Sequence, residues 1–146
     1  MLNNVSKLLT GDILKILCDM GHGDSIVIAD ANFPADTCSK RLVRLPGINA
    51  SQVINAIKNL FPLDVNYSDF PVSVMDLTDA DKKKGMKEPV AWTDVKNILK
   101  EQYPSLELGK VERFDFYERA KNAYAVIATG EERIYGNFIL VKGCVL

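Results

Sequence analysis

The sequence predicts one α/β domain over residues 1–146, a three-layer α/β/α arrangement with a mixed central sheet. The first observation is length, because 146 residues are close to the roughly 150 of an average domain. The second is pattern: short apolar strands alternate with amphipathic helices, as in a sheet covered on both faces. The third is composition, with 47% hydrophobic and 25% charged residues, typical of globular domains. No repeat or Pro/Gly-rich linker divides the chain.

The first half of the chain predicts two helices and two strands. Thr10 can cap a helix whose apolar face runs to Met20, and Gly21 can end that helix. A fully apolar strand is predicted over 25–29, followed by a weaker strand over 41–45. A second helix is predicted over 49–62, with Asn49 as its cap and Pro62 as its stop.

The second half predicts further elements around a less patterned stretch. That stretch runs from about Pro62 to Pro89 and carries a Lys82–Lys84 run, which indicates the solvated face of a long loop or short helix. Thr93 is the predicted cap of a third helix. Four further strands are predicted: one over 72–76, a short one that ends at Val111, one over 123–129 and one over 137–141. A short helix is predicted over 116–122. Because loop 130–136 is too short for a helical crossover, the last two strands are expected to pair antiparallel.

Charge and motifs exclude several classes of function. The 18 basic and 19 acidic residues give a net charge of −1, which disfavours electrostatic binding to nucleic acid or to an anionic membrane. The three cysteines are widely spaced and there is one histidine, so a Cys/His zinc site is not expected. No phosphate-loop, dinucleotide or metalloprotease motif is found, so reactions that depend on those motifs have little support. Without a signal peptide or a membrane-length apolar run, we expect a cytoplasmic protein with reduced thiols.

The single histidine, His22, is the first candidate for chemistry. It lies between Gly21 and Gly23, just before an apolar strand, and the two glycines leave its imidazole accessible. Histidine donates and accepts protons near neutral pH without heavy tuning of its pKa. The alternative is an ordinary loop histidine that hydrogen-bonds to the backbone.

Three further groups could form a ligand site. Asp30 follows the apolar strand, at the end where α/β sheets bind ligands, although it could equally cap a turn. Tyr135, Gly136 and Asn137 offer a phenol, a backbone N–H and an amide, which suit a polyhydroxyl ligand or an ordinary turn. The stretch 113–119 alternates aromatic and charged side chains, as in an interface between chains or a core cluster with surface ion pairs.

These stretches, taken together, resemble the family of L-fucose mutarotases and D-ribose pyranases. The resemblance spans nearly the whole chain in the family's order, and its residues are Met20-Gly-His-Gly-Asp24, Ile28-Ala-Asp-Ala-Asn-Phe-Pro-Ala35, Arg113-Phe-Asp-Phe-Tyr-Glu-Arg-Ala120, Thr129-Gly-Glu131, Tyr135-Gly-Asn137 and Lys142-Gly143. The chain resembles the fucose branch most, because ribose pyranases tend to carry additional histidines late in the chain. Asn32, often histidine in close relatives, and the stretch 62–90 depart from the family pattern.

The resemblance implies a function and a site. It implies that His22 is the proton donor of a mutarotase acting on the anomers of L-fucose, without cofactor or metal. It implies sugar-binding roles for Asp30, Arg113 and the group Tyr135, Gly136 and Asn137, with Tyr117 and Arg119 as further walls. The alternatives are pyranose–furanose interconversion of D-ribose, a non-catalytic sugar-binding protein, and a scaffold whose aromatic stretch serves oligomerisation.

The spacing of His22 and Asp30 raises a question about the assembly. An extended strand over 25–29 separates its ends by roughly 17 Å, too far for both side chains to hold one monosaccharide. Either the turn at His22 bends back along the strand, or two chains share the site. The family forms ring-like homo-oligomers, commonly decamers, with sugar sites at subunit interfaces, so the resemblance implies a composite site.

Overall fold

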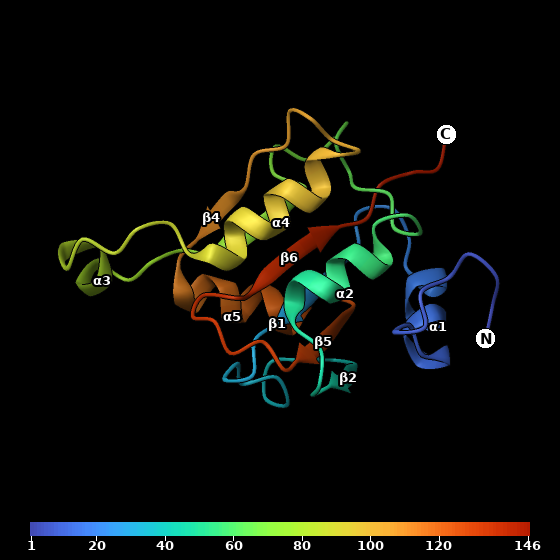
Figure 1. Cartoon of the computed structure of the whole chain (residues 1–146), viewed down its shortest axis with the longest axis horizontal. Coiled ribbons are helices and arrows are strands. Elements are labelled where there is room, and N and C mark those ends of the chain that lie inside the picture. The colour runs from blue at the N-terminus through green and yellow to red at the C-terminus, as the bar shows by residue number, and fades with distance from the viewer.

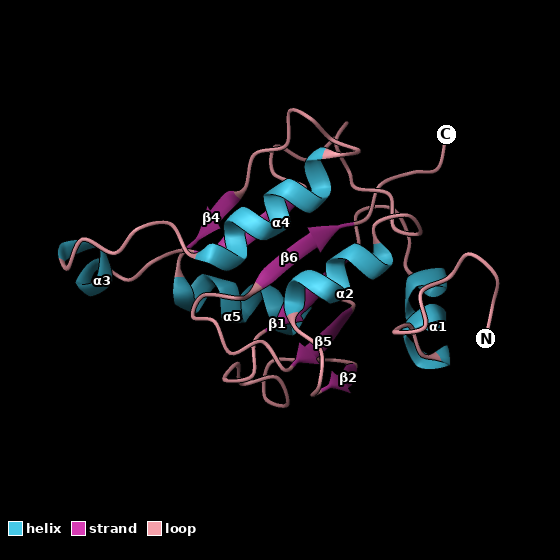
Figure 2. Cartoon of the chain, in the orientation of Figure 1, coloured by secondary structure: helices cyan, strands magenta, loops and turns pink.

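A computed structural model describes all residues, 1–146, as one domain built on a six-stranded mixed sheet (Figures 1 and 2). The strand order is β2-β5-β1-β6-β3-β4. The strands are β1 (Ser25–Ala29), β2 (Leu42–Leu45), β3 (Val72–Met75), β4 (Gly109–Val111), β5 (Ala125–Thr129) and β6 (Phe138–Val141). The helices are α1 (Gly11–Asp19), α2 (Ala50–Ile57), α3 (Asp79–Lys83), α4 (Val90–Lys100) and α5 (Arg113–Asn122).

Helices cover both faces of the sheet, as the apolar pattern predicts. Alternate residues of β1 point to opposite faces: Ile26 and Ile28 enter a core with α2 and α4, whereas Val27 and Ala29 enter a second core with α5. Figure 1 shows α2 and α4 on the near face of the sheet, on either side of β6, and α5 on the far face. The predicted three-layer α/β/α arrangement is therefore confirmed.

Two of the predicted helix caps are confirmed and one is wrong. The Thr10 side chain accepts a hydrogen bond from the backbone of Ile13, and Asn49 forms a capping box with Gln52. Thr93, in contrast, lies inside α4, which begins one turn earlier after Pro89. The start of α4 buries Ala91 and Trp92 against the core, and this tertiary gain is not visible in a capping pattern.

The predicted helix over 116–122 also begins earlier than expected. The carboxylate of Glu112 accepts hydrogen bonds from the backbone N–H groups of Phe114 and Asp115, so α5 starts at Arg113. An acidic side chain at this position stabilises the positive end of the helix dipole. The earlier start places Arg113 and Tyr117 on one helix, one turn apart.

The pairing predicted for the last two strands is wrong, although their directions are opposite as expected. β1 lies between β5 and β6, parallel to β5 and antiparallel to β6. Loop 130–136 spans two inter-strand spacings, roughly 10 Å, and needs no helix to do so. The strand that is apolar on both faces, β1, therefore takes the centre of the sheet, and its two ends become the two candidate sites.

A segment over 76–89 leaves the sheet between β3 and α4 and carries α3 at its tip (Figure 1). Its Lys82–Lys84 run falls on and beside this short helix, one of the two structures expected for it. The Thr78 side chain caps α3 by accepting a hydrogen bond from the backbone of Asp81. No residue of α3 is buried. None of the helices is both long and apolar enough to span a bilayer.

Candidate functional site

Five of the predicted sugar-site residues line one cavity of about 340 Å³. They are Asp30, Arg113, Tyr117, Tyr135 and Asn137. The cavity lies where β1 ends and β6 begins, and its volume is within the range of small-molecule sites. A larger cavity of about 530 Å³ lies elsewhere, between segments 65–71 and 102–107. We take the smaller cavity as the candidate site because two of its polar side chains are buried and hold each other in place.

Those two buried side chains are Asp30 and Asn137. The Asn137 amide oxygen accepts a hydrogen bond from the Asp30 backbone N–H at 2.8 Å, and the Asn137 amide nitrogen donates to Asp30 Oδ2 at 2.7 Å. Asp30 Oδ1 accepts from the Asn32 backbone N–H at 3.0 Å. Asp30 is 8% exposed. Each carboxylate oxygen keeps a lone pair, so the pair forms a rigid acceptor for hydroxyl groups.

Burial raises the pKa of Asp30 above its ordinary value. Hydrogen bonds from Asn32 and Asn137 oppose this effect without cancelling it, and the negative charge of Glu131 adds to it. No cation forms an ion pair with the Asp30 carboxylate. A carboxylate that is hydrogen-bonded but has no counter-ion retains a strong tendency to accept further hydrogen bonds.

Arg113 and Tyr117 approach the cavity from α5. Arg113 Nε donates a hydrogen bond to the Tyr117 hydroxyl at 3.0 Å, and the guanidinium lies 5.7 Å from the centre of the Tyr117 ring. The terminal nitrogens of Arg113 make no hydrogen bond within the chain. The Tyr117 hydroxyl accepts from Arg113 and still has its own proton to donate. Arg113 and Tyr117 therefore add donors to the cavity that Asp30 lines as an acceptor.

Tyr135 lines the cavity, but its hydroxyl already has partners. The hydroxyl donates to the Asp81 carboxylate and accepts from the Thr78 backbone N–H at 3.1 Å. Tyr135 thus ties segment 76–89 to the edge of the cavity. Its backbone φ of +59° is in the left-handed region, uncommon for a side chain larger than glycine.

Two of the predicted sugar-binding residues do not line the cavity. Gly136 lies behind it, where a Cβ atom would come within 2.5 Å of Glu131 Cγ, so its small size allows loop 130–136 to pack closely. Arg119 pairs instead with Asp115 on the exposed side of α5, although the resemblance implied a wall position.

Sequence reasoning missed several lining residues, including Met75, Thr78 and Ile134. Met75 and Thr78 belong to the stretch 62–90, which departs from the family pattern. Thr78 and Asp81 have the spacing of a helix-start signal, which could have indicated an ordered segment there.

His22 lies at the other end of β1. Its Nε2 is 3.3 Å from Oδ1 of the buried Asp64, and its ring centre is 5.2 Å from that of Tyr67. The imidazole is 42% exposed, as expected from its flanking glycines, and Gly23 has a φ of +84°. Neither partner was predicted from the sequence.

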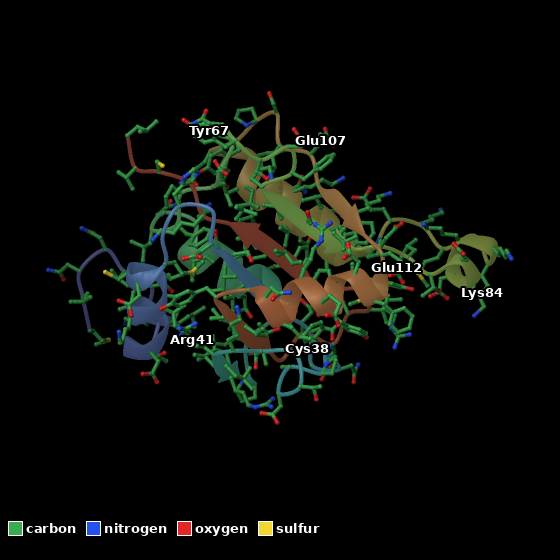
Figure 3. The ribbon with its side chains drawn as sticks, turned by 180° about the vertical axis from the view of Figure 1, so that it is seen from behind. Cys38, Arg41, Tyr67, Lys84, Glu107 and Glu112 are labelled. Atoms are coloured by element: carbon green, nitrogen blue, oxygen red, sulfur yellow. The ribbon has the colours of Figure 1, made fainter.

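The turn at His22 does not bend back toward Asp30. The backbone N–H of Gly23 donates to the Lys142 carbonyl and the N–H of Lys142 donates to the Asp24 carbonyl, each at 2.8 Å, so the turn continues the β1–β6 ladder. In Figure 3, Tyr67, whose ring lies beside His22, and Glu112, which precedes Arg113, lie well apart, Tyr67 at the upper edge and Glu112 toward the α3 side. One chain therefore holds the predicted proton donor and the cavity at opposite ends of the sheet.

The site offers no metal centre. No three His, Cys, Asp or Glu side chains are close enough to share an ion. Its chemistry consists of hydrogen-bond donors and acceptors at one end of the sheet and a His–Asp pair at the other.

Comparison with known proteins places the chain in a family. The model of the RbsD / FucU transport protein family matches residues 3–145. The chain belongs to this family. A human protein named fucose mutarotase is 46% identical over 145 residues, covering 97% of this chain and 93% of that protein. The crystal structure of the fucose mutarotase from Streptococcus pneumoniae in complex with L-fucose is 37% identical, with a TM-score of 0.89, covering 99% of this chain and all of that chain.

Within the RbsD/FucU family, the fucose branch is the more similar. The structure of Bacillus subtilis RbsD complexed with D-ribose aligns over the full length of both chains, but with 26% identity and a TM-score of 0.72. The absence of histidines beyond His22 agrees with this ordering. The single domain and the mixed sheet that chain length and sequence pattern predict are confirmed.

Proposed function

We propose that this protein is an isomerase that interconverts the α and β anomers of L-fucopyranose. The observation that carries the proposal is that polar residues far apart in the sequence meet in one cavity, in a chain similar over nearly its full length to proteins named fucose mutarotase. Fucose is uncharged and rich in hydroxyl groups, so it needs paired donors and acceptors rather than a counter-ion.

In this proposal the cavity orients the sugar. Asp30 accepts hydrogen bonds from sugar hydroxyls, while Asn137 holds the carboxylate in place. The free nitrogens of Arg113 and the hydroxyl proton of Tyr117 donate to sugar oxygens from α5. Tyr135 closes one edge of the cavity, and Gly136 allows loop 130–136 to pack closely against the Glu131 side chain.

His22 performs the proton transfer. As His22 protonates the ring oxygen, the anomeric hydroxyl loses its proton to water and the bond between the anomeric carbon and the ring oxygen breaks. The open aldehyde rotates, and the reverse steps close the ring on its other face. The Asp64 carboxylate, whose Oδ1 lies 3.3 Å from His22 Nε2, stabilises the protonated ring and leaves Nδ1 for the sugar. One positioned acid–base group supplies on the order of 10²–10⁴-fold.

Because one chain keeps His22 away from the cavity, a second copy supplies it. The proposal is a ring-like homo-oligomer, a decamer in the form that the resemblance implies, with each sugar site at a subunit interface. The exposed Tyr67 ring beside His22 offers an aromatic surface for such a contact. The proposed compartment is the cytoplasm. Light scattering measures the assembly size, and cell fractionation tests the compartment.

Saturation-transfer NMR of L-fucose tests the function. Adding the protein should speed exchange between the two anomeric proton signals, and His22→Ala should remove the effect while circular dichroism stays unchanged. A Lys15→Ala variant, changed on the exposed side of α1, serves as the matched control and should keep full activity. Faster exchange with D-ribose but not with L-fucose would favour the ribose reaction. Binding without faster exchange would favour a non-catalytic sugar-binding protein.

Mixing inactive variants tests the composite site. Oligomers assembled from His22→Ala and Asp30→Ala chains contain some interfaces with both an intact His22 and an intact Asp30. Such mixed oligomers should recover part of the activity that neither variant has alone. No recovery in mixed oligomers verified by native mass spectrometry would contradict a site shared between chains.

A further inference from the structure

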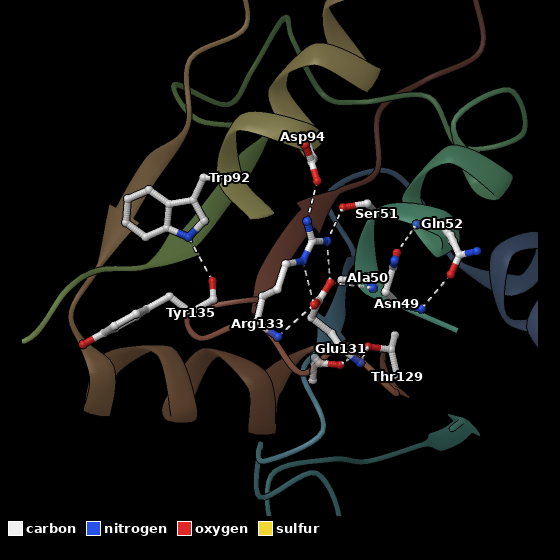
Figure 4. A network of polar contacts seen from close by, with 11 residues as sticks. Asn49, Ala50, Ser51, Gln52, Trp92, Asp94, Thr129, Glu131, Arg133 and Tyr135 are labelled. Carbon is white, nitrogen blue, oxygen red and sulfur yellow. Dashed lines mark hydrogen bonds and ion pairs between the residues drawn. The ribbon is translucent and has the colours of Figure 1, made fainter. Parts of the chain in front are cut away.

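Loop 130–136, which delivers Tyr135 and Asn137 to the cavity, is held by an ion pair between the buried Glu131 and the half-buried Arg133, outside the cavity (Figure 4). Glu131 is 2% exposed, and each of its carboxylate oxygens accepts a hydrogen bond from the Arg133 guanidinium, from Nε at 2.8 Å and from Nη2 at 2.7 Å. The backbone N–H of Arg133 also donates to Glu131, at 3.0 Å. The two side chains thus form a closed bidentate pair inside one short loop.

The same pair bridges the loop to two helices on the α2/α4 face of the sheet. Glu131 Oε2 accepts from the backbone N–H of Ala50, in the first turn of α2, at 3.3 Å. Arg133 Nη2 donates to the Ser51 hydroxyl at 3.0 Å, and Nη1 donates to the Asp94 carboxylate of α4. The guanidinium therefore joins three separate segments, and it lies outside the cavity lining.

The ion pair fixes the position of the loop residues that line the cavity. The Glu131 carbonyl accepts from the backbone N–H of Ala31, directly after Asp30, at 2.9 Å. Gly136 packs on the Glu131 side chain, and Trp92 of α4 donates to the Tyr135 carbonyl at 2.9 Å. Between these anchors, Tyr135 keeps its left-handed φ, a conformation that persists where its surroundings determine it.

We propose that Arg133 is a positioning residue of the sugar site. It acts through Glu131 to fix loop 130–136 so that Tyr135 and Asn137 face the sugar. The inference rests on the proposed function for its catalytic readout, and it concerns a residue that does not touch the sugar. The guanidinium fork is required, because a lysine ammonium at this position could not make the bidentate contact with Glu131 while also reaching Asp94 and Ser51.

Steady-state exchange kinetics with L-fucose test the proposal. Arg133→Met should raise KM by about tenfold and change kcat by less than about threefold, because the loop binds hydroxyls whereas His22 moves the proton. Arg133→Lys should fall between this variant and the wild type. The matched control is Lys58→Met, which removes an ion pair with Glu101 at the opposite ends of α2 and α4 and should leave both constants unchanged.

A second readout does not depend on catalysis. In ¹⁵N NMR spectra, Arg133→Met should shift the amide signals of Tyr135, Gly136 and the Asn137 side chain and speed their hydrogen exchange. Amides in β1 and β5 should keep their protection, which shows that the variant is folded. If the wild-type protein did not speed fucose exchange but Arg133→Met still produced these shifts, the proposed function would be overturned and the positioning role of Arg133 would stand. Unchanged shifts and an unchanged KM in a folded Arg133→Met variant would overturn the role of Arg133.

Discussion

Two buried carboxylates near the same end of the sheet, Asp30 and Glu131, have opposite surroundings. Glu131 is enclosed by the Arg133 guanidinium, and although burial alone would raise its pKa, Arg133 holds that pKa below the ordinary value. Asp30 has amide partners only, and burial raises its pKa. A carboxylate with a matching cation has little remaining capacity for a ligand, whereas one held only by amides keeps that capacity. The comparison separates a structural carboxylate from a binding one.

The ion pair between Glu131 and Arg133 also explains why the Asp30 and Glu131 carboxylates can lie near each other. The charge of Glu131 contributes to the raised pKa of Asp30, so the two carboxylates repel each other. Arg133 offsets the charge of Glu131, and its pKa is raised in turn by the hydrogen bond to that carboxylate. Asp30 can therefore lie beside loop 130–136 without a counter-ion of its own because Arg133 neutralises the charge of Glu131.

The largest expected effect is a loss of stability, and it follows from neutralising Glu131, the structural carboxylate. Glu131→Gln leaves the Arg133 cation without its main counter-charge and turns an amide N–H₂ toward the Ala50 N–H. Removing one partner of a buried ion pair costs about 3–5 kcal/mol, and because the Arg133 side chain is 33% exposed we expect about 3 kcal/mol. Urea unfolding measures this loss, and the melting temperature should fall by about 6–12 °C.

The matched comparison is Asp30→Asn, which should cost only about 1 kcal/mol. It leaves the Asn137 amide facing another amide but removes a buried charge, and these two changes partly cancel. If Asp30→Asn destabilised the protein as much as Glu131→Gln, the division into a binding and a structural carboxylate would be wrong.

The next effect is on sugar binding. Asp30→Asn should weaken L-fucose binding by about 10- to 100-fold, because a hydrogen bond to a charged group is worth about 1.5–3 kcal/mol. Isothermal titration calorimetry measures the affinity directly. An Asp115→Asn variant, which removes an exposed carboxylate that pairs with Arg119 away from the cavity, is the control and should bind normally. Unchanged affinity in Asp30→Asn would place the sugar elsewhere.

The sequence predicts the local features of this fold because they depend on neighbouring residues. Thr10 and Asn49 cap helices that follow them directly, and the apolar run 25–29 forms a strand with the predicted ends. Thr93 was misassigned because the burial of Trp92 depends on the sheet beneath it. The central place of β1 between β5 and β6 depends on long-range pairing, which periodicity does not contain.

The site was predicted as separate residues rather than as contacts. Asp30 and Asn137 were each identified, but their mutual hydrogen bonds join positions 107 apart in the sequence. Arg133 was overlooked because a charged residue in a short loop is ordinarily solvated. Its partners in α2 and α4 become neighbours only after the sheet and the helices have packed together. Asp64 could not be predicted as a partner of His22 for the same reason, because their contact joins two loops that are far apart in the sequence.

The smallest expected effect, on the pH dependence of stability, tests the comparison most directly. Because the pKa of Asp30 is higher in the folded state, the folded protein binds the extra proton, and the contribution of Asp30 falls as pH rises above about 3.9 toward that raised value. The lowered pKa of Glu131 gives the opposite sign: its contribution is complete above about 4.3 and is lost as pH falls below that. Unfolding free energies from about pH 3 to pH 7 should therefore show the difference between wild type and Asp30→Asn declining with pH, and that between wild type and Glu131→Gln growing. Slopes of the same sign would mean that one environment surrounds both carboxylates, and the distinction between them would fail.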